Sequence, residues 1–453
     1  MVNVADVLST AIVDELFPSD RELLPDLNDM YELELAFYEN KLLSDQEMLR
    51  NAAYFARVGH FYTRHYLMCT GHPLKLPQHA SSRLKSFFAK NVFRTGYATH
   101  GLFPYRGKFH PQMIKGLMNV MGLKPGEVVL DPMMGSGTVL VEATLMGIRS
   151  IGVDASPFCR FMARTKVDAL TLPLGRVHKA LSNFEEVFQY FQNRVGKADA
   201  GTKTRRSAKS QDFMTVLEPA AEYVAKNEST ALTEKQKETS KVYNFLLLAY
   251  LDSAGYAERS SRISPVQQFK AILERYLFVA EKIQNVLKGA ERELAISEAI
   301  EGDARTLPQE ENSVDGIIFS PPYSFAIDYL QNDSFHLNFL GVRLEDLREH
   351  MIGLRGKKLG DKFELYKEDM DKVLSECARV LCPGRICTIV VGTNNNQLGK
   401  ILELPPDEVP GLHEMLSEMA SRHGFKLIKQ MSRPITGISN TMRREYILML
   451  QKR

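Results

Sequence analysis

The sequence predicts an α/β fold in which helices cover a mostly parallel, doubly wound sheet. Short apolar segments recur along the chain, and segments rich in helix-forming residues separate them. Several apolar segments end in an acidic residue, as 127–131 and 150–154 do. Strands that alternate with helices pair in parallel, because each connection has to cross back over the sheet. Side chains at the strand ends should therefore gather at one edge of the sheet.

The strands are expected where apolar and β-branched residues run together. They are the segments 127–131, 150–154, 314–320, 385–391, 425–431 and 445–450, with one more from near Leu294 to Asp303. The last two segments form a closing pair, which predicts an antiparallel strand at the C-terminal end of the sheet. Helices are expected at 112–121 and 138–146, on either side of the first strand.

The pattern divides the chain into three regions. These are a helical N-terminal region (1–95), the sheet domain (96–165 and 294–453) and a helical insertion (166–293). The N-terminal prediction rests on apolar residues at helical spacing in 31–38 and on an aromatic-rich segment at 54–66. The insertion interrupts the alternation of strands and helices, with helices expected at 177–195, 235–251 and 265–288.

The composition is that of an ordinary soluble globular protein. Hydrophobic residues make up 44%, charged residues 25%, and the formal net charge is +2. A basic surface for nucleic acid would therefore have to be local. We see no secretory signal and no apolar run near the length of a membrane span, and the five cysteines fit neither a disulfide framework nor a zinc site. The expectation is a cytoplasmic protein with reduced thiols and no metal.

A glycine-containing turn at 131–137 follows a strand and opens a helix, which is the context of a nucleotide-type cofactor site. A phosphate-binding loop would need a lysine that is absent. A dinucleotide fingerprint would need a third glycine where Leu140 stands. Two readings remain: a cofactor without a pyrophosphate, and a turn without a ligand, which explains Gly-x-Gly alone equally well.

Acids at strand ends favour the cofactor. Asp154 ends the second strand, where its carboxylate can accept hydrogen bonds from the two hydroxyls of a ribose. Asp303 is expected to end a third strand, where it can accept from an adenine amino group. A single Asp at a strand end is more often a cap or a turn residue. Three acids ending successive strands, with Asp131 as the first, are harder to explain in that way.

Two motifs together resemble those of a known family. Asp131-Pro-Met-Met-Gly-Ser-Gly-Thr138 with Ser320-Pro-Pro-Tyr323 is similar to the paired cofactor and catalytic motifs of S-adenosylmethionine-dependent amino-methyltransferases, which modify cytosine N4 or adenine N6 in DNA. The Ser-Pro-Pro-Tyr form is found more often among the cytosine-N4 enzymes. The resemblance covers about 95–165 and 295–453, and it implies the Rossmann-like fold of class I methyltransferases. Many relatives carry an aromatic residue where this chain has Met133 and Met134, whose thioethers can fill that space.

The resemblance and the strand ends together imply a cofactor site for S-adenosylmethionine. The residues expected there are Asp131, Pro132, Met133, Gly135, Ser136, Gly137, Thr138, Asp154, Ala155, Asp303 and Ala304. The segment 100–111 resembles the motif that lines the methionine end of the cofactor in this family. It adds Lys108 and His110, for which positioning or packing is expected rather than catalysis.

The resemblance implies a catalytic role for the proline corner at 320–323. The Ser320 hydroxyl and the Pro321 carbonyl would accept hydrogen bonds from the target amino group, and the prolines, including Pro322, would hold them rigid. Tyr323 would stack on a base flipped out of the duplex. Taken alone, the corner would favour a rigid turn with a packing tyrosine; together with the glycine turn upstream, it favours the catalytic interpretation.

Two segments are candidates for contact with nucleic acid. The insertion carries a basic loop with Arg205 and Arg206, and the loop 348–362 carries Arg355, Lys357 and Lys358. We expect the second loop to contact the backbone near the flipped base. A solvated loop explains the basic residues of the insertion equally well.

The functional prediction is a site-specific DNA methyltransferase, with cytosine N4 favoured over adenine N6. One alternative is an RNA enzyme of the tRNA guanine-N2 type, which usually carries Asp or Asn where this chain has Ser320. Another alternative is a non-catalytic nucleic-acid-binding subunit with a methyltransferase fold. DNA is the expected partner, and a restriction or phage-defence partner, which the sequence does not identify, is compatible with the resemblance.

Overall fold

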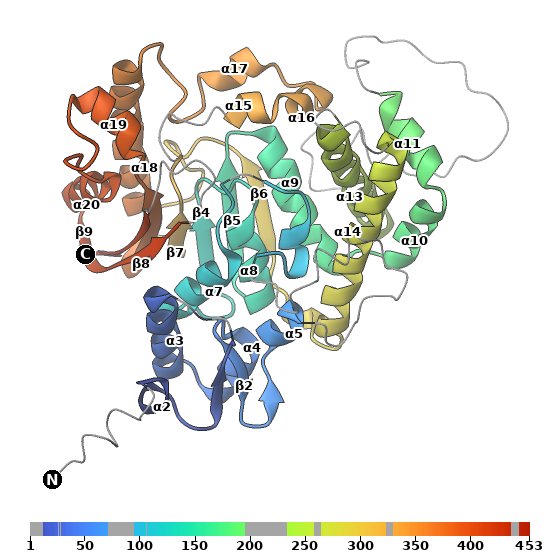
Figure 1. Ribbon diagram of the computed structural model, residues 1–453, viewed down its shortest axis with the longest axis horizontal. Coiled ribbons are helices and arrows are strands. Elements are labelled where there is room, and N and C mark those ends of the chain that lie inside the picture. Colours follow the sequence, from blue (N-terminus) through green and yellow to red (C-terminus); the bar gives the residue numbers. More distant parts are fainter. Residues whose placement is uncertain are drawn as a thin grey trace.

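A computed structural model describes residues 12–25, 27, 29–70, 95–105, 107–194, 233–257, 264–322, 329–435 and 444–453. At its centre lies a seven-stranded sheet in the order β6-β5-β4-β7-β8-β10-β9. The strands are β4 (Val128–Asp131), β5 (Arg149–Asp154), β6 (Ser297–Glu301), β7 (Val314–Phe319), β8 (Leu381–Gly392), β9 (Phe425–Pro434) and β10 (Arg444–Lys452). Figure 1 shows the strands of this sheet side by side, from β9 and β8 on the left to β5 and β6 near the centre.

The pairing of the strands confirms the predicted sheet. β4 pairs in parallel with β5 and β7, β5 with β6, and β7 with β8. β10 runs antiparallel to both β8 and β9, which is the predicted closing pair. The third strand ends at Glu301, so Asp303 lies two residues beyond it.

Side chains alternate between the two faces of the sheet, so each strand contributes to two cores. Val129 and Ile318 pack on one face with α7 (Pro111–Val120) and α8 (Thr138–Met146). Leu130 and Ile317 pack on the other with α18 (Leu359–Val380) and α20 (Leu412–Arg422). This two-sided burial explains why the central strands are read as continuous apolar runs. The predicted helices at 112–121 and 138–146 are thereby confirmed.

The N-terminal region combines helices with a small sheet. Its helices are α2 (Ile12–Leu16), α3 (Met30–Leu42), α4 (Asp45–Asn51) and α5 (Arg64–Cys69). Its antiparallel sheet is formed by β1 (Arg21–Leu23), β2 (Phe55–Val58) and β3 (Phe61–Tyr62). The prediction of a helical region missed this sheet, because strands of two to four residues are too short for a clear alternation of apolar and polar side chains. Gly59, at φ +58°, makes the turn between β2 and β3.

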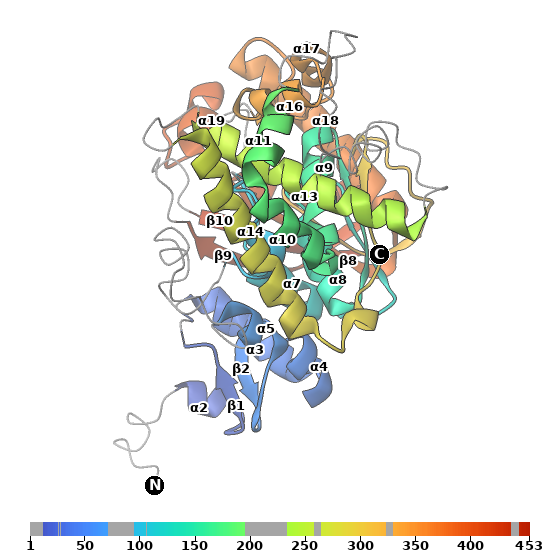
Figure 2. The ribbon, with the colours of Figure 1, turned by 90° about the vertical axis from the view of Figure 1, so that its right-hand side faces the viewer.

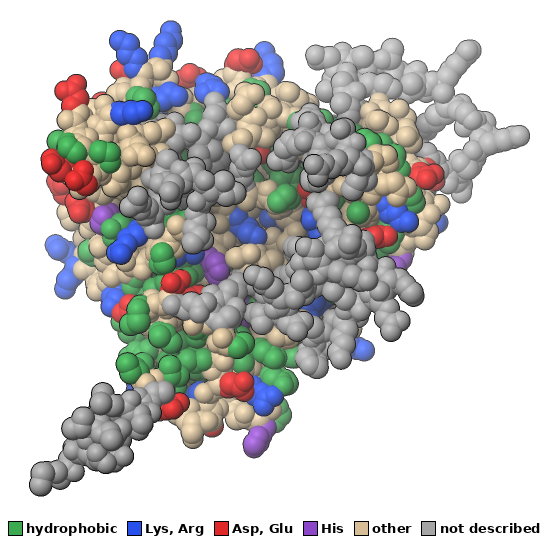
Figure 3. All heavy atoms as spheres, in the orientation of Figure 1, with side chains coloured by type: hydrophobic (Ala, Val, Ile, Leu, Met, Phe, Trp, Pro, Cys, Tyr) green, Lys and Arg blue, Asp and Glu red, His purple; other side chains and the backbone are tan. Residues whose placement is uncertain are grey.

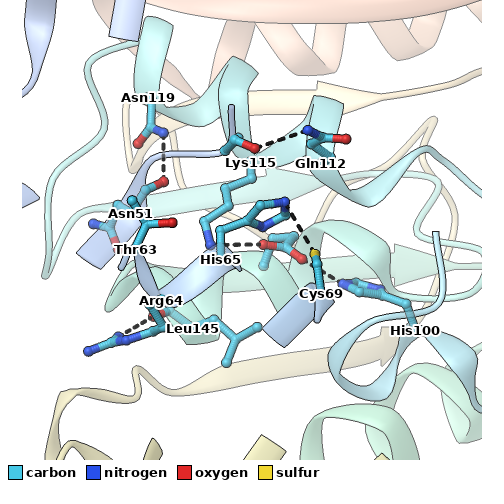
Figure 4. A network of polar contacts seen from close by, with 12 residues as sticks. Asn51, Thr63, Arg64, His65, Cys69, His100, Gln112, Lys115, Asn119 and Leu145 are labelled. Carbon is cyan, nitrogen blue, oxygen red and sulfur yellow. Dashed lines mark hydrogen bonds and ion pairs between the residues drawn. The ribbon is translucent and has the colours of Figure 1, made fainter. Parts of the chain in front are cut away.

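A buried polar network joins this region to the sheet domain (Figure 4). His100 Nε2 lies 2.6 Å from Glu142 Oε1 on α8, and Lys115 Nζ on α7 lies 4.0 Å from Glu142 Oε2. Asn119, at the end of α7, donates to the carbonyl of Asn51 at 2.9 Å. We call Glu142, His100 and Lys115 the seam cluster; all three belong to the sheet domain, whereas the contact of Asn119 with Asn51 crosses to the N-terminal region. All three side chains are buried.

The predicted insertion consists of helices in its described part. These helices are α10 (Leu174–Ser182), α11 (Phe184–Gln192), α13 (Glu234–Ala257) and α14 (Pro265–Leu287). The helix before them, α9 (Pro157–Asp168), extends from the sheet domain into the first residues of the insertion. The helix expected at 177–195 is divided into two at Asn183. α13 and α14 pack along each other (Figure 2). The basic segment 196–210 lies outside the described residues.

The α14 helix also contacts the segment that precedes α7. The Phe103 N–H donates to Tyr276 Oη at 2.7 Å, and Tyr276 in turn donates to Asp252 Oδ2 at 3.2 Å. Asp252 forms an ion pair with Arg275 at 2.7 Å, so α13 and α14 share a buried charged contact.

The remaining short helices and turns lie in the connections between these elements. They are α15 (Tyr329–Asn332), α16 (Ser334–Phe339), α17 (Leu344–Arg348) and α19 (Asn395–Leu402), with the 3-10 turns η1 (Ala98–Gly101), η2 (Ala169–Thr171) and η3 (Glu291–Glu293). Within the described part of the chain, no helix is both long enough and apolar enough to cross a bilayer.

Candidate active site

The glycine turn joins β4 to α8 and closes on the end of the neighbouring strand. The Gly135 N–H donates to Asp154 Oδ2 at 2.9 Å. Gly137 has φ +75°, and a Cβ there would lie 2.6 Å from Cβ of Ala163 on α9. Both the left-handed backbone and the close approach of α9 therefore require glycine at this position. The turn is thus built to hold the backbone at the carboxyl edge of the sheet.

A pocket opens at this edge, with about 770 Å³ of empty space when its opening to solvent is included. It is lined by Tyr105, Gly107, Lys108, Phe109, Met133, Met134, Gly135, Ser136, Thr138, Asp154, Ser156, Cys159, Ser320, Pro321, Pro322, Leu330, Asp333, Leu337 and Met351. The glycine turn and the proline corner, distant in sequence, thus share one pocket.

The lining separates the predicted residues into two groups. The pocket includes Lys108, Met133, Gly135, Ser136, Thr138, Asp154, Ser320, Pro321 and Pro322. Its lining does not include Asp131, Pro132, Gly137, Ala155, Asp303, Ala304 or His110. Tyr323 lies outside the described residues. All of this second group except His110, which precedes α7, lie at or just beyond the ends of β4, β5 or β6, and the roles of the whole group remain predictions.

Of the strand-end acids, Asp131 is buried and Asp154 is partly buried, and each accepts few hydrogen bonds within the chain. Asp131 Oδ1 accepts from the Met133 N–H at 3.1 Å, and its Oδ2 has no hydrogen-bond partner among the described residues. Burial raises the pKa of Asp131 well above its usual range. Burial also raises the pKa of Asp154, although the N–H groups of Ser156 (2.8 Å) and Gly135 oppose the rise.

The third acid, Asp303, is engaged within the chain. The Arg305 guanidinium binds its carboxylate through two nitrogens, with Nε at 2.9 Å from Oδ1 and Nη2 at 2.7 Å from Oδ2. Burial opposes ionisation, but the hydrogen bonds from Arg305 hold the pKa of Asp303 below its usual value. Arg305 Nη1 also donates to Asp369 Oδ1 at 2.9 Å. The predicted contact of Asp303 with adenine would have to share the carboxylate with Arg305.

Lys108 extends into the pocket from the segment before α7. Its Nζ donates to the carbonyl oxygens of Thr95 (2.7 Å) and His100 (3.2 Å). Burial lowers the pKa of Lys108 to about 8. His110 is the N-cap residue of α7. These placements are compatible with the positioning and packing roles expected for the two residues.

The proline corner follows β7 directly. The Ser320 hydroxyl donates weakly to the carbonyl oxygen of Pro321 at 3.5 Å, so two oxygens lie side by side at the pocket. The loop after α17 packs on this corner, since a Cβ at Gly353 would lie 3.8 Å from Cβ of Pro322. Met351 of the same loop lines the pocket. The loop chosen from the sequence as a neighbour of the chemistry thus contacts the corner.

Several pocket residues carried no signal in the sequence, and Asp333 is the most informative of them. Asp333 is the N-cap residue of α16, yet its side chain makes no capping hydrogen bond. Burial raises its pKa to about 7, and the charge of Asp154 adds to the rise. No strand ends at this residue, so the rule that found Asp131 and Asp154 could not find it. The packing of α16 against α9 and α13 accompanies the position of Asp333 at the pocket.

The basic residues of the loop 348–362 differ in their surroundings. Arg355 Nη2 donates to the buried Asp369 Oδ1 at 2.9 Å, which compensates the charge of Arg355 within the chain. Lys357 and Lys358 are exposed. Lys and Arg side chains are visible at the top of the molecule, over α17 and the start of α18 (Figure 3). Arg205 and Arg206 lie outside the described residues.

The described residues contain no group of three or more His, Cys, Asp or Glu side chains arranged to hold a metal ion. The five cysteines, which all lie in the described part, are free thiols. The pocket is therefore assessed through its carboxylates, its lysine and its backbone groups.

Comparisons with known proteins agree with this geometry. Residues 102–228 match the model of the UPF0020 family, described as an RMKL-like methyltransferase domain. The chain is similar to the type II methyltransferase M.BsoBI of Geobacillus stearothermophilus, with 22% identity over 278 residues that cover 55% of this chain and 54% of that protein. It is also similar to a tRNA (guanine(10)-N2)-dimethyltransferase of Methanothermobacter thermautotrophicus, with 42% identity over 52 residues that cover 12% and 16%.

A solved structure of an S-adenosylmethionine-dependent methyltransferase from Methanosarcina mazei aligns with 73% of this chain and 94% of its own, with 10% identity and a TM-score of 0.30. The chain spans about half the length of M.BsoBI.

The order of the strands, with five parallel strands followed by the antiparallel β10 inserted beside β8, matches the Rossmann-like sheet that the motifs imply. The glycine turn and the matched domain lie in the same part of this sheet. Together they identify the sheet and its flanking helices as an S-adenosylmethionine-dependent methyltransferase fold.

Proposed function

We propose that the chain transfers a methyl group from S-adenosylmethionine to the exocyclic amino group of a base in DNA at a specific site, with cytosine N4 favoured over adenine N6. One observation carries the proposal: Ser320 and Pro321 line the same pocket as the glycine turn and Asp154. A donor held by the turn and Asp154 would lie next to the corner that receives the amino group.

The groups of the pocket fit S-adenosylmethionine. The Asp154 carboxylate can accept hydrogen bonds from ribose hydroxyls in addition to the two N–H groups that it already receives. Lys108 has one N–H beyond the two used on carbonyl oxygens, and this N–H can reach a carboxylate. The cofactor, when bound, supplies an electrophilic methyl group.

The proline corner prepares the nucleophile. The amino nitrogen of cytosine or adenine is a poor nucleophile, because its lone pair is delocalised into the ring. Ser320 Oγ and Pro321 O can accept the two amino hydrogens, which draws the nitrogen towards a pyramidal geometry with its lone pair directed at the methyl group. After transfer the nitrogen is cationic and readily loses a proton, so no strong base is required. Catalysis by this corner consists mainly of alignment.

The nucleic acid would approach over the loop 348–358. Lys357 and Lys358 are exposed and can contact phosphates, while Arg355 holds the loop through Asp369. The target base would be flipped out of the duplex, because its amino group cannot be reached inside it. We assign the stacking contact with that base to Tyr323, and further phosphate contacts to Arg205 and Arg206.

The similarities also support one alternative function, which is methylation of RNA. The type II methyltransferase M.BsoBI covers more than half of this chain, whereas the tRNA (guanine(10)-N2)-dimethyltransferase covers a short segment at higher identity. Ser320 favours the DNA proposal, since tRNA guanine-N2 enzymes usually carry Asp or Asn at that position. A non-catalytic subunit is the other competitor, and the acceptor pair at the corner argues against it.

The proposal is tested by incubating the full chain with methyl-labelled S-adenosylmethionine and, separately, DNA and RNA. Each polymer is digested to nucleosides, and mass spectrometry locates the label. We expect N4-methylcytosine from DNA. N6-methyladenine from DNA would change the base but retain the polymer and the chemistry. Label in N2-methylguanine from RNA would overturn the DNA proposal, and cofactor binding without transfer to either polymer would support the non-catalytic subunit.

A further inference from the structure

Asp333 is a pocket acid whose role neither the fold nor the catalytic corner explains. It occupies the N-cap position of α16, where an aspartate ordinarily accepts a hydrogen bond from the first turn of the helix. Here its side chain makes no such bond and lines the pocket instead, with 13% of the side chain exposed. A carboxylate that leaves its own helix uncapped is available to a ligand.

The titratable groups around Asp333 come from four elements. His336 Nδ1, one turn along α16, lies 3.9 Å from Asp333 Oδ1. Asp154 at the end of β5, Cys159 on α9 and Tyr105 before α7 interact with Asp333 electrostatically. Lys108 lines the same pocket and donates to two backbone carbonyls. The pocket thus holds two carboxylates and one ammonium group.

We propose that Asp333, together with Asp154, makes the pocket select the cationic cofactor S-adenosylmethionine over its uncharged thioether product, S-adenosylhomocysteine. The inference rests on the cofactor site of the proposed function and not on the identity of the methylated polymer. It assigns to Asp333 a role in cofactor specificity, and it predicts that the attraction to the cofactor falls when the methyl group leaves.

The charge balance supports this role. S-adenosylmethionine and S-adenosylhomocysteine share the adenosine, the amino group and the carboxylate, and they differ by a methyl group and the positive charge of the sulfonium. Transfer of the methyl group to the base amino nitrogen leaves both electrons of the broken bond on sulfur, which becomes neutral. A carboxylate in a largely buried pocket interacts with a nearby unit charge more strongly than it would in water. The pocket therefore distinguishes the two ligands at the one atom that changes.

The surroundings of Asp333 disfavour its ionised form, and a bound cation would favour that form again. Two carboxylates that line the same pocket disfavour each other's ionisation, and burial and the charge of Asp154 raise the pKa of Asp333 to about 7. A cation bound between or beside them favours the ionised form. S-adenosylmethionine should therefore bind more tightly as the pH rises through this range, while S-adenosylhomocysteine should not.

The test is isothermal titration of three probes into the wild-type chain and the Asp333→Asn variant, without nucleic acid. The probes are S-adenosylmethionine, S-adenosylhomocysteine and sinefungin, which carries an amino group in place of the methylsulfonium. We expect Asp333→Asn to weaken binding of the two cationic probes about tenfold and to leave S-adenosylhomocysteine within about twofold. Unchanged affinity for S-adenosylhomocysteine also shows that the variant is folded.

Two further variants complete the design. Asp333→Glu keeps the charge and should retain most of the preference for the cationic probes. Asp346→Asn is the matched control, because Asp346 lies exposed on α17, paired with Arg343, and does not line the pocket. It should change none of the three affinities. Equal loss of all three probes in Asp333→Asn would assign Asp333 a structural role and overturn the proposal, as would an unchanged preference.

The same titrations at about pH 6 and about pH 7.5 separate Asp333 from its neighbours. The wild-type affinity for S-adenosylmethionine should rise between these values, and the rise should disappear in Asp333→Asn. A rise that persists in the variant would assign the titration to another group, such as His336, and would contradict the proposal. Because no polymer is present, failure here is distinguishable from failure of the DNA methylation proposal.

Discussion

The seam cluster and the pocket both contain acidic side chains shielded from water, and the pKa of these acids is shifted in opposite directions. In the seam cluster, burial alone would raise the pKa of Glu142, but the hydrogen bond with His100 and the charge of Lys115 hold it below its usual range. At the pocket, burial raises the pKa of Asp154 and Asp333, and burial also raises the pKa of Asp131, which ends β4 beside the glycine turn but does not line the pocket. The seam acid has its charge compensated inside the protein, whereas the pocket acids do not.

This difference separates a structural use of charge from a ligand-binding one. A buried carboxylate without a counter-charge costs stability, so a fold retains one mainly where something else supplies the partner. The seam cluster should therefore matter for folding and little for chemistry. The pocket should matter for the cofactor and the methyl transfer and little for folding. Four substitutions test how sharp this division is.

Ser320→Ala should have the largest effect, and only on catalysis. It removes one of the two oxygens that can accept the target amino hydrogens, so methyl transfer should fall about 100-fold or more. The affinity for S-adenosylmethionine should stay within about twofold of wild type. Single-turnover transfer of a labelled methyl group measures the first, and calorimetry measures the second. Ser334→Ala, whose hydroxyl is exposed and donates to the Gln331 carbonyl, is the control. Normal turnover by Ser320→Ala would refute the alignment mechanism.

Glu142→Gln should have the largest effect on stability. It removes the charge that faces Lys115 and His100, and breaking a buried pair by removing one partner costs about 3 kcal/mol. Urea denaturation of the chain measures this loss. Glu293→Gln removes an exposed partner of Arg64 and should cost less than about 1 kcal/mol. A seam variant as stable as this control would abolish the distinction between the two regions.

Tyr276→Phe probes the contact between α14 and the pocket-lining segment. The change leaves the buried Phe103 N–H without its acceptor and removes a donor to Asp252, which should cost about 1–2 kcal/mol. Cofactor affinity should also fall modestly, because Tyr105 follows Phe103 closely in the chain and lines the pocket. Tyr38→Phe, which removes a partly buried bond to Glu34, should be nearly neutral. If stability fell without any change in cofactor affinity, the contact made by α14 would have a structural role only, like that of the seam cluster.

Asp131→Asn should have the smallest effect on folding. Burial raises the pKa of Asp131 well above its usual range, and Asp131→Asn replaces a buried carboxyl group, whose Oδ2 has no hydrogen-bond partner among the described residues, by an amide of nearly the same shape. We expect the free energy of unfolding to change by less than about 1 kcal/mol without cofactor. Parallel urea curves with Glu142→Gln make the comparison direct. A loss as large as that of Glu142→Gln would show that Asp131 is ionised and paired.

Much of the sheet could be predicted from the sequence, because its central strands are buried on both faces and are bounded by clear turns. The strand expected at 314–320 forms β7, Val314–Phe319, and the turn that follows it lies in the pocket. The strand expected at 150–154 begins one residue earlier, at Arg149. Parallel pairing then explains why Asp154 and Ser320 reach the same pocket although they are distant in sequence.

Other features depend on contacts that no local pattern encodes. Arg305 and Arg355 both pair with Asp369, so these contacts depend on how α18 packs against the sheet. Asp303 and Arg355, which were expected to contact ligands, thus form ion pairs within the protein. Asp333 was missed for the opposite reason, since an N-cap position predicts a local hydrogen bond that the side chain does not make. The short strands β2 and β3 were missed because they offer too few residues for a pattern.

The central claim is that the pocket beside the proline corner binds S-adenosylmethionine through the strand-end acids. Calorimetric titration of S-adenosylmethionine into the wild-type chain and into Asp154→Ala, in the absence of nucleic acid, tests it most directly. We expect one site per wild-type chain and binding weakened about tenfold or more in the variant, since Asp154 is proposed to supply the acceptors for the ribose hydroxyls. Absence of binding by the wild-type chain, or equal binding by Asp154→Ala, would contradict it.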